Sequence, residues 1–451
     1  MALNWHLYLS VGVFLAVIIA IAFDLLPMVV ASLLGTAILY LSGVIGSAEH
    51  SAARIAADPV LSLLIGGMVV TRALAPTKVF DWLSAKLVSL LKGKGWRLLV
   101  GIVLLTICVS SVLPNEIAII LLAPVIIEAG RRFKIDIAPL MMLAVFAANS
   151  AGLLTSIGDP ATYIGASAMN ETFLGYMQRM TAGAMLAILT LIALLPVVFR
   201  DIWHQELEVL PQGPGEVSGV PAIARPVVLA LLLAIMGLMV LFFVIGDTLP
   251  SPIAPQLSCL SFATLALTVV HLSRLDSVDD LIKDIDWETI VFLASIFILV
   301  QGLETSGAIS LLGTTMAKVL GGNVLVASLT VLASFGLFSG FVPNAPLMAT
   351  TAPLVKSYLV SAGLASQELL THGAAKMPGE VLVFFYAMLL GVTLGGNLTL
   401  LGASANIVAC GICARAGSRI TFAKFLRYGI PVTICQLCVS ALFVIVKLQL
   451  R

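Results

Sequence analysis

Two polar interruptions each occur twice in this chain of 451 residues, and both copies stand in apolar surroundings. Pro114-Asn115 in the first half corresponds to Pro343-Asn344 in the second half, 229 residues later. Thr155-x-x-Gly158 likewise corresponds to Thr399-x-x-Gly402, 244 residues later. Proline and glycine disfavour a continuous helix, so the apolar helices are expected to break at both copies. Paired breaks at corresponding places in two halves indicate a secondary transporter whose binding site lies at the breaks.

The composition indicates the medium in which the chain folds. Hydrophobic residues make up 60% of the sequence and charged residues only 10%. A soluble globular protein carries about 25% charged residues, so the chain is predicted to be an integral membrane protein. The formal net charge of +1 provides no strongly basic surface for a nucleic acid. The expected partner is therefore the lipid bilayer, with a multi-pass location in the inner (cytoplasmic) membrane.

Runs of apolar residues predict ten membrane spans, because about 20 residues cross the hydrocarbon core. They lie at about 7–23, 27–46, 60–75, 138–168, 181–199, 225–246, 255–272, 288–303, 381–414 and 430–448. The fourth and ninth are overlong and contain the Gly, Asn and Thr breaks, so each is predicted to be one broken span. Two further pieces, 97–130 and 323–362, each consist of two short apolar arms around a Pro-Asn. An amphipathic segment precedes each of them, at 78–93 and 308–320.

Basic residues indicate how the piece 97–130 is inserted, since they mark the cytoplasmic side of a membrane protein. Lys and Arg flank it at both ends, so it is predicted to enter and leave as a re-entrant hairpin. Each half then has five spans and one hairpin, and an odd number of spans inverts the second half. This arrangement places 17 of the 24 Lys and Arg residues on the cytoplasmic side and both termini outside.

The predicted fold is an all-α polytopic membrane protein with two inverted repeats. Each repeat has five transmembrane helices plus a re-entrant hairpin, and the broken helices lie at the midplane. The predicted parts are the first repeat (1–200, hairpin 97–130, broken helix 138–168), a cytoplasmic linker (201–224) and the second repeat (225–451, hairpin 323–362, broken helix 381–414).

The breaks supply the candidate binding groups. Freed carbonyls with Asn, Ser and Thr oxygens suit a hard cation, and half-helix N-termini suit an anion. Asn115 and Asn344 are expected to cap the second arm of each hairpin and to line the cavity between the tips. The alternative is that the small and hydroxyl residues only allow close helix packing. The candidate substrate- and ion-binding residues are Asn115, Glu116, Thr155, Ser156, Gly158, Asp159, Asn344, Asn397, Thr399, Gly402, Ser404 and Asn406.

Two carboxylates belong to the first copy alone. Glu116 and Asp159 lie inside its motifs, whereas Ala345 and Ala403 occupy the matching places in the second. An ionisable residue at membrane depth is a functional candidate, so both are predicted proton carriers or cation ligands. The structural alternatives are an N-cap beside Pro160 for Asp159, and an ion pair in a wet vestibule for Glu116.

Six cysteines include two C-x-x-C pairs, at Cys410 and Cys413 and at Cys435 and Cys438. This spacing suits a metal or redox pair, but both pairs lie in apolar stretches without a second pair or a histidine nearby. We expect no metal site and no cofactor other than a bound proton or Na⁺ as the coupling ion.

The glycine-rich stretch of the second half carries a family resemblance. This stretch resembles the glycine-rich signature of one group in the ion transporter superfamily. That group contains ArsB-type arsenite permeases, the melanosomal P protein and NhaD-type sodium/proton antiporters. The residues concerned are Gly395-Gly396-Asn397-Leu398-Thr399-Leu400-Leu401-Gly402-Ala403-Ser404-Ala405-Asn406. Ile157-Gly158-Asp159-Pro160 resembles the paired signature of the first half. The resemblance implies a homodimer and elevator-like movement of hairpins and broken helices against a scaffold. The partners expected with it are a small inorganic ion or oxyacid and a soluble ATPase subunit.

Related dicarboxylate carriers have Ser-Asn-Thr at both hairpin tips, and here only Asn115 and Asn344 match that pattern. The missing hydroxyls favour proton-coupled efflux of arsenite or a similar small oxyacid. The alternatives are a Na⁺/H⁺ antiporter and an ion-coupled di- or tricarboxylate transporter. A passive channel would need a continuous polar stripe, and an enzyme would need a catalytic constellation that the five scattered histidines do not supply.

Overall fold

A computed structural model describes residues 5–23, 25–46, 58–79, 82, 86, 93–207, 223–246, 249, 253–371 and 379–450. Its elements are α1 (Trp5–Ala22), α2 (Met28–Leu41), α4 (Pro59–Leu74), η1 (Ala75–Thr77), β1 (Gly93–Lys94), α6 (Gly95–Ser110), α7 (Asn115–Phe133), α8 (Ile137–Ala151), α9 (Pro160–Ala168), α10 (Phe173–Val198), α11 (Arg200–Trp203), β2 (Glu206–Leu207), α12 (Pro226–Ile245), α13 (Pro255–Ser273), α14 (Val278–Lys283), α15 (Trp287–Thr305), α16 (Ala308–Leu320), α17 (Val324–Phe338), α18 (Asn344–Ser361), α19 (Glu368–Thr371), α20 (Gly379–Gly395), α21 (Ser404–Arg415) and α22 (Phe422–Gln449).

The all-α polytopic class predicted from the sequence is confirmed. In the described residues, six helices are long and apolar enough to cross a membrane: α4 with the turn after it, α10, α12, α13, α15 and α22. The shorter apolar helices include α1, α2, α8 of the first broken span, and α20 and α21 of the second. The strands β1 and β2 have two residues each and form one short antiparallel pair.

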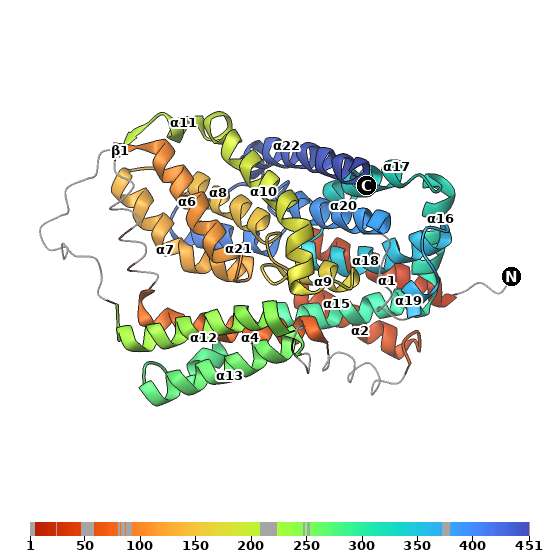
Figure 1. The fold of residues 1–451 in the computed structure, drawn as a ribbon, viewed down its shortest axis with the longest axis horizontal. Coiled ribbons are helices and arrows are strands. Elements are labelled where there is room, and N and C mark those ends of the chain that lie inside the picture. The colour runs from red at the N-terminus through yellow and green to blue at the C-terminus, as the bar shows by residue number, and fades with distance from the viewer. Residues whose placement is uncertain are drawn as a thin grey trace, which may run out of the picture.

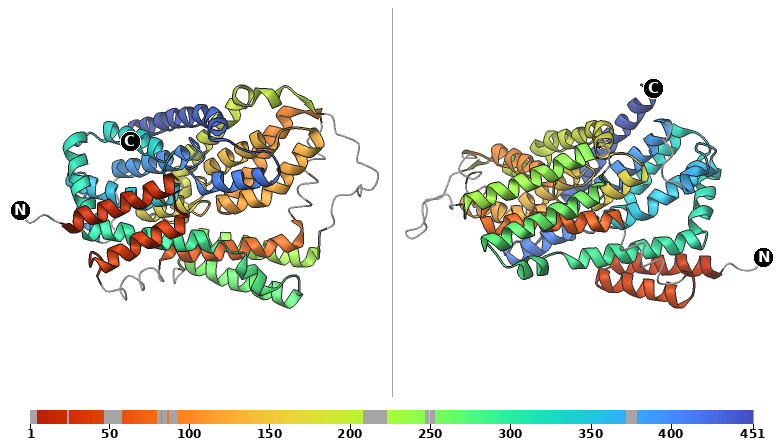
Figure 2. Two further views of the ribbon diagram at one scale, coloured as in Figure 1. Left: turned by 180° about the vertical axis from the view of Figure 1, so that it is seen from behind. Right: turned by 60° about the horizontal axis from the view of Figure 1, so that its bottom comes forward.

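The helices form two layers, which Figure 1 shows one above the other. In the lower one, α4 packs on α12 and α13, while α15 packs on α1, α2 and α4; we call these six helices the scaffold layer. The other, here called the site layer, contains the pairs α6–α7 and α17–α18, the broken helices, α10 and α22. The helix α1 begins and α22 ends towards the same end of the molecule, as two further views also show (Figure 2).

Packing contacts recur in matched pairs between the two halves. The contact of α2 with α15 corresponds to that of α13 with α4, because each joins the second helix of one half to the third helix of the other. In the site layer, α6 packs on α8 as α17 packs on α20. Contacts that cross between the halves also match, since α7 packs on α21 and α18 packs on α9. The two halves are therefore built alike and interlocked, whereas their inverted orientation in a membrane stays a prediction.

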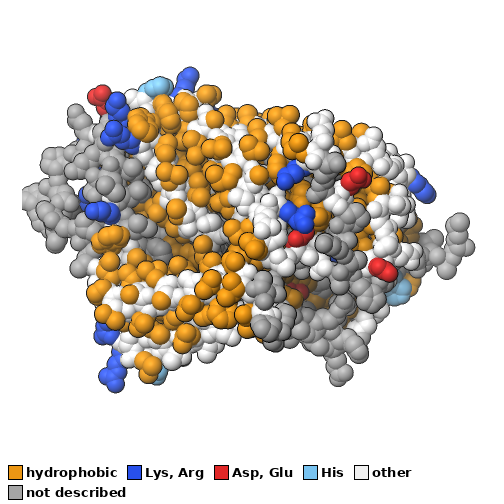
Figure 3. All heavy atoms as spheres, in the orientation of Figure 1, with side chains coloured by type: hydrophobic (Ala, Val, Ile, Leu, Met, Phe, Trp, Pro, Cys, Tyr) orange, Lys and Arg blue, Asp and Glu red, His pale blue; other side chains and the backbone are white. Residues whose placement is uncertain are grey.

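The outer surface is apolar and the centre of the site layer is fully buried. Figure 3 shows hydrophobic side chains over most of one face, with charged groups gathered mainly towards its two ends. Every residue of α8 is buried, and so is α20 from Val381 onward. A helix that is apolar all round belongs in such a centre, because it has no polar face for solvent.

Two predicted connecting segments are described only in part. The amphipathic segment 308–320 is α16, whereas most of 78–93 lies outside the described residues. The predicted linker 201–224 begins with ordered structure, because α11 covers its first residues and β2 pairs with β1. Residues 208–222 of the linker lie outside the description.

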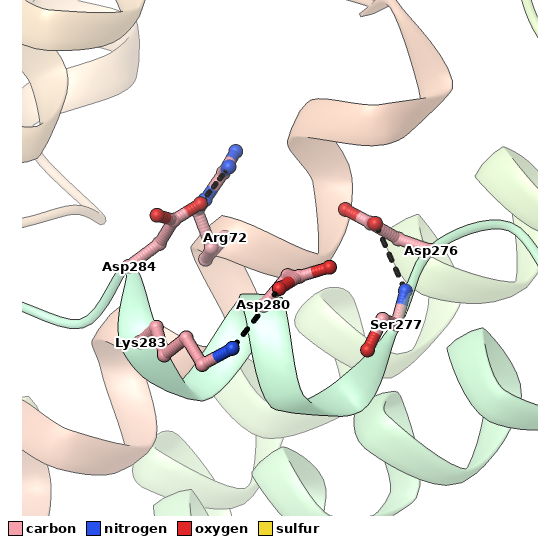
Figure 4. A network of polar contacts seen from close by, with 6 residues as sticks. All are labelled: Arg72, Asp276, Ser277, Asp280, Lys283 and Asp284. Atoms are coloured by element: carbon pink, nitrogen blue, oxygen red, sulfur yellow. Dashed lines mark hydrogen bonds and ion pairs between the residues drawn. The ribbon is translucent and has the colours of Figure 1, made fainter.

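Ion pairs beside α14 anchor the start of α15, the scaffold helix that faces the site (Figure 4). The Arg72 Nε donates to Asp284 at 2.9 Å, which ties the end of α4 to the segment before α15. Asp286 then caps α15 by accepting from the Thr289 backbone N–H at 3.0 Å and from its hydroxyl at 2.6 Å. The position of Thr289 is thus fixed by its own helix cap.

Candidate functional site

Four helix N-termini converge on one small cavity inside the site layer. The first residues of α7, α9, α18 and α21 are Asn115, Pro160, Asn344 and Ser404, and all four line this cavity. Its volume is about 20 Å³, which is room for one water-sized species. The first turn of a helix has unpaired N–H groups and the positive end of the helix dipole, so the cavity is surrounded by groups that favour negative charge.

The side chain of Asn115 joins the tip of the α6–α7 pair to the first broken helix. Its Oδ1 accepts from the Ser110 hydroxyl at 2.6 Å, and its Nδ2 donates to Asp159 at 2.8 Å and to Asn149 at 3.4 Å. The expectation that Asn115 and Asn344 cap their helices is wrong. Pro114 and Pro343 occupy the N-cap positions, and neither helix has a side-chain cap.

Asp159 both caps a helix and accepts a hydrogen bond from the hairpin tip. One carboxylate oxygen accepts from the Ala161 N–H at 2.9 Å and so caps α9, and the other accepts from Asn115. The side chain is buried and lines the cavity. The structural alternative of an N-cap is therefore present, but it leaves the second oxygen facing the hairpin tip and the site.

Glu116 stands where the small cavity meets a larger vestibule. It lines both the 20 Å³ cavity and an open vestibule of about 620 Å³, together with Thr289 and Ser404. No ion pair of Glu116 with a basic residue is found among the described residues, although Arg415 lines the same vestibule.

Asn344 is held differently from its counterpart in the first half. The Ser339 hydroxyl lies 2.5 Å from the Val392 carbonyl and 2.9 Å from the Asn344 side-chain amide. A hydroxyl has one proton and a carbonyl can only accept, so Ser339 donates to Val392 and accepts from Asn344. The amide nitrogen then also reaches the Gly402 carbonyl at 2.9 Å. This orientation turns the Asn344 Oδ1 towards the cavity, whereas Asn115 turns its nitrogen there.

The threonines of the two doubled motifs link each broken helix to a hairpin tip. Thr155 donates to the Ser111 carbonyl at 2.6 Å. Thr399 donates to the Gly340 carbonyl, and Ser111 and Gly340 are again 229 residues apart. Neither threonine is among the residues that line the cavity, so their hydroxyls hold the backbone around the site rather than contact its contents.

The motif glycines allow the broken helices to approach the hairpin tips. A Cβ added to Gly158 would lie 2.8 Å from the Ser110 carbonyl oxygen, and one added to Gly402 would lie 2.7 Å from that of Ser339. Real Cβ atoms essentially never come so close. Glycine is therefore required at both positions by close backbone contact, since neither has a positive φ.

The remaining candidates lie away from the cavity. Ser156 lines a separate pocket of about 250 Å³ near Asn170. Asn406 donates to the Gly396 and Thr399 carbonyls, both at 2.8 Å, and holds the second break in shape. Asn397 belongs to a buried chain of amides. Of the twelve candidates, the structure brings Asn115, Glu116, Asp159, Asn344 and Ser404 to the cavity.

Sequence reasoning missed several groups that belong to this region. Asn149 and Thr289 line the cavity, and Ser110 and Ser339 contact the tip asparagines. The two serines stand five residues before each asparagine, so hydroxyls are present at both tips despite the prolines. The sequence signal for these two serines was the repeat itself, because Ser110 and Ser339 are separated by the same 229 residues as the two asparagines.

The cavity lies between two vestibules arranged along α15. Asp286, Glu288 and Thr289 at the start of α15 line the 620 Å³ vestibule, and residues 289, 292 and 293 line the small cavity. Phe297 and Glu304, further along the helix, line another vestibule of about 550 Å³. Of these two vestibules, the first shares lining residues with the cavity and the second does not, among the residues that the structure describes.

A family model described as "Citrate transporter" (CitMHS) matches residues 16–372. The chain belongs to this family. A transporter from Synechocystis is 40% identical to it over 98% of both chains, and a transporter from Mycobacterium tuberculosis is 30% identical over 96% of this chain and 97% of the relative. The human P protein is 23% identical over 96% of this chain and 59% of its own length.

Two solved transporters share the fold. The YdaH transporter of Alcanivorax borkumensis, which has an unusual topology, matches with a TM-score of 0.59 over 89% of this chain and 87% of that chain, at 13% identity. MtrF of Neisseria gonorrhoeae, from a class of antimetabolite efflux pumps, matches with a TM-score of 0.51 over 88% and 82%, also at 13% identity. The chain is thus a multi-pass membrane transporter of the ion transporter group, as its signature predicted, and not an enzyme.

Proposed function

We propose that this protein is a secondary active transporter of the cytoplasmic membrane that couples the movement of a carboxylate such as citrate to protons. The observation that carries the proposal is the convergence of four helix N-termini on one cavity. Each terminus favours a nearby negative charge by about 0.3–1 kcal/mol, and more where it is partly buried. An anion that carries carboxylates can use several of these termini together.

The two carboxylates in the same place supply the coupling. Asp159 and Glu116 both line the cavity, and no Lys or Arg is among the described residues that line it with them. An anionic substrate beside two ionised carboxylates is repelled, so substrate binding requires that protons bind first. The 20 Å³ cavity has room for one water-sized group, such as a single carboxylate end of the substrate, and the remainder of the substrate occupies the adjoining 620 Å³ vestibule.

Arsenite efflux and Na⁺/H⁺ antiport are the competing functions. The expectation of arsenite rested on the family resemblance and on the missing hydroxyls at the hairpin tips. Ser110 and Ser339 do place hydroxyls against the two tip asparagines, behind the cavity lining. Arsenite is neutral near pH 7 and gains little from four helix N-termini, whereas a sodium ion is opposed by them. The family description also favours a carboxylate. A homodimer and elevator-like movement belong to this proposal, and a soluble ATPase subunit does not.

Purified protein in proteoliposomes tests the proposal. Uptake of radiolabelled citrate, arsenite and Na⁺ is measured separately, each with the outside acidified and with no pH gradient. We expect citrate uptake that increases with the imposed gradient and collapses with a protonophore. Arsenite or Na⁺ movement without citrate movement would replace the proposal by one of the two competing functions.

A further inference from the structure

Gln436 is the one residue of α22 that enters the amide chain behind the site. It is fully buried in the middle of α22, where most of its neighbours along the helix are apolar. Its Nε2 donates to the Ser150 hydroxyl at 2.8 Å and to the Ala187 carbonyl at 3.0 Å, while its Oε1 accepts from Asn397 at 2.9 Å. One side chain thereby joins α8, α10 and α22 to the second break.

The chain of hydrogen bonds continues from Asn397 to the hairpin tip. Asn149 donates to the Asn397 Oδ1 at 2.9 Å, and Asn115 donates to the Asn149 Oδ1 at 3.4 Å. Asn115 uses the same nitrogen to donate to Asp159. Four amides in succession thus connect α22 with the carboxylate of the candidate site.

Gln436 sets the direction of the amides at the α22 end of this chain. The Ala187 carbonyl can only accept, and the Ser150 hydroxyl gives its proton to the Phe146 carbonyl at 2.7 Å. Both partners therefore require the nitrogen of the Gln436 amide. Its oxygen must then face Asn397, which turns the Asn397 oxygen towards Asn149. Asn406 acts in the same sense on Asn149, because its Nδ2 donates to the Gly396 and Thr399 carbonyls and its Oδ1 accepts from Asn149 at 3.3 Å.

The hydrogen bond from Asn115 to Asn149 connects this chain of amides to the site. Asn149 must present its oxygen to the hairpin tip, so Asn115 must present its nitrogen there and towards Asp159. If Asn149 turned over, two NH₂ groups would face each other. Hydrogen bonds in such a chain polarise one another, so a change at one end alters the other.

The chain is also asymmetric between the halves. Gln436 stands 15 residues after the N-cap Thr421 of α22, and Ala187 stands 15 residues after the N-cap Thr172 of α10. The small side chain at the matching place in α10 leaves its carbonyl within reach of the glutamine. Only the second half therefore supplies the anchoring amide, and it acts on the carboxylate of the first half.

We propose that Gln436 is a positioning residue for transport, which orients Asn115 towards Asp159 through Asn397 and Asn149 without touching the substrate. The transport measurement that tests this inference rests on the proposed function. It adds a residue outside both doubled motifs and outside the cavity lining.

The test compares Gln436→Leu and Gln436→Glu with Thr433→Val in proteoliposomes. Thr433 is a buried residue of the same helix whose hydroxyl has no hydrogen-bond partner among the described residues, so it controls for a polar-to-apolar change. We expect Gln436→Leu to raise the KM for citrate by about tenfold or more, with Thr433→Val unchanged. A KM of Gln436→Leu equal to that of the wild type would overturn the proposal.

Gln436→Glu adds a readout that general damage to the fold does not produce. A protonated glutamic acid can donate to the Ala187 carbonyl, whereas the ionised form faces two acceptors. Uptake by Gln436→Glu at citrate well below the KM, taken relative to the wild type at each pH, should therefore recover as the pH falls. A ratio independent of pH would contradict the positioning role.

A double-mutant cycle separates failure of this inference from failure of the proposed function. Melting temperatures in detergent are measured for Gln436→Leu, Asn115→Ala and the double variant. If the chain is coupled, the double variant loses less than the sum of the two single losses. Additive losses of melting temperature would show that the four amides are not coupled, whatever the substrate is. Absence of citrate uptake by the wild type would overturn only the proposed function.

Discussion

At the scale of single residues, the account depends on how the Asn115 amide is held. It donates to Asp159 from one side and accepts from Ser110 on the other, so both ends of the amide are committed. For its matching residue, Asn344, the repeat has Ala403 at the place that corresponds to Asp159, and the Asn344 amide turns the other way. The two tips share a backbone arrangement but present opposite polarity to the cavity.

Asn115→Ala should abolish citrate uptake while the protein still folds. The change removes the donor to Asp159 and leaves a buried carboxylate oxygen without that partner, which costs about 1–3 kcal/mol of stability. Uptake in proteoliposomes and the melting temperature measure the two effects. Asn323→Ala is the matched control, because Asn323 caps the exposed start of α17 away from the cavity. Normal uptake by Asn115→Ala would remove Asn115 from the site.

At the scale of elements, the helix breaks follow from proline and glycine, and the sequence located them well. The doubled motifs predicted where both helices stop, and the repeat interval also held for Ser110 and Ser339. The amide chain could not be predicted. Asn115, Asn149, Asn397 and Gln436 lie on four separate elements, and only tertiary packing brings them together. A glutamine in the mostly apolar middle of α22 was the available signal.

Gly158→Ala should destabilise the first break. The new Cβ would lie 2.8 Å from the Ser110 carbonyl oxygen, so the loop must move away from the hairpin tip. Such overpacking costs about 1–3 kcal/mol. The melting temperature in detergent and citrate uptake should both fall. Gly237→Ala, inside α12 with open space around its Cβ, should instead be neutral or stabilising. Equal melting temperatures for Gly158→Ala and the wild type would contradict the close contact.

Acid should weaken the connection between α8 and α22. Asp136 caps α8 and pairs with Lys424 at 2.6 Å, outside the membrane-spanning segments. Partial burial raises the pKa of Asp136, but the hydrogen bonds from Lys424, Ser418 and the Ala138 N–H outweigh it and leave the pKa below its usual value. A lowered folded pKa stabilises the protein above the unfolded pKa, and this stabilisation is lost as the pH falls through the folded pKa.

The melting temperature should therefore decline on acidification below about pH 4, and less so in Asp136→Asn. Because both partners are partly exposed, the pair contributes at most about 1 kcal/mol. An identical acid decline in the wild type and in Asp136→Asn would exclude this contribution.

At the scale of the whole molecule, two halves with matched packing enclose one asymmetric site. The helices of both halves supply the four N-termini, but only the first half supplies Glu116 and Asp159. The scaffold layer adds Thr289 from α15 to the wall of the cavity. The cavity shares lining residues with the 620 Å³ vestibule. Under the proposed function, alternation between two matched arrangements of the halves would expose the cavity to each vestibule in turn.

The central claim is that these two carboxylates couple protons to carboxylate movement. The most direct measurement is citrate accumulation driven by an imposed pH gradient, for the wild type, Glu116→Gln and Asp159→Asn, beside citrate exchange without a gradient. We predict that wild-type accumulation rises with acid outside, and that at least one of the variants retains exchange but loses the dependence on the gradient. Unchanged dependence on the gradient in both variants would contradict the account.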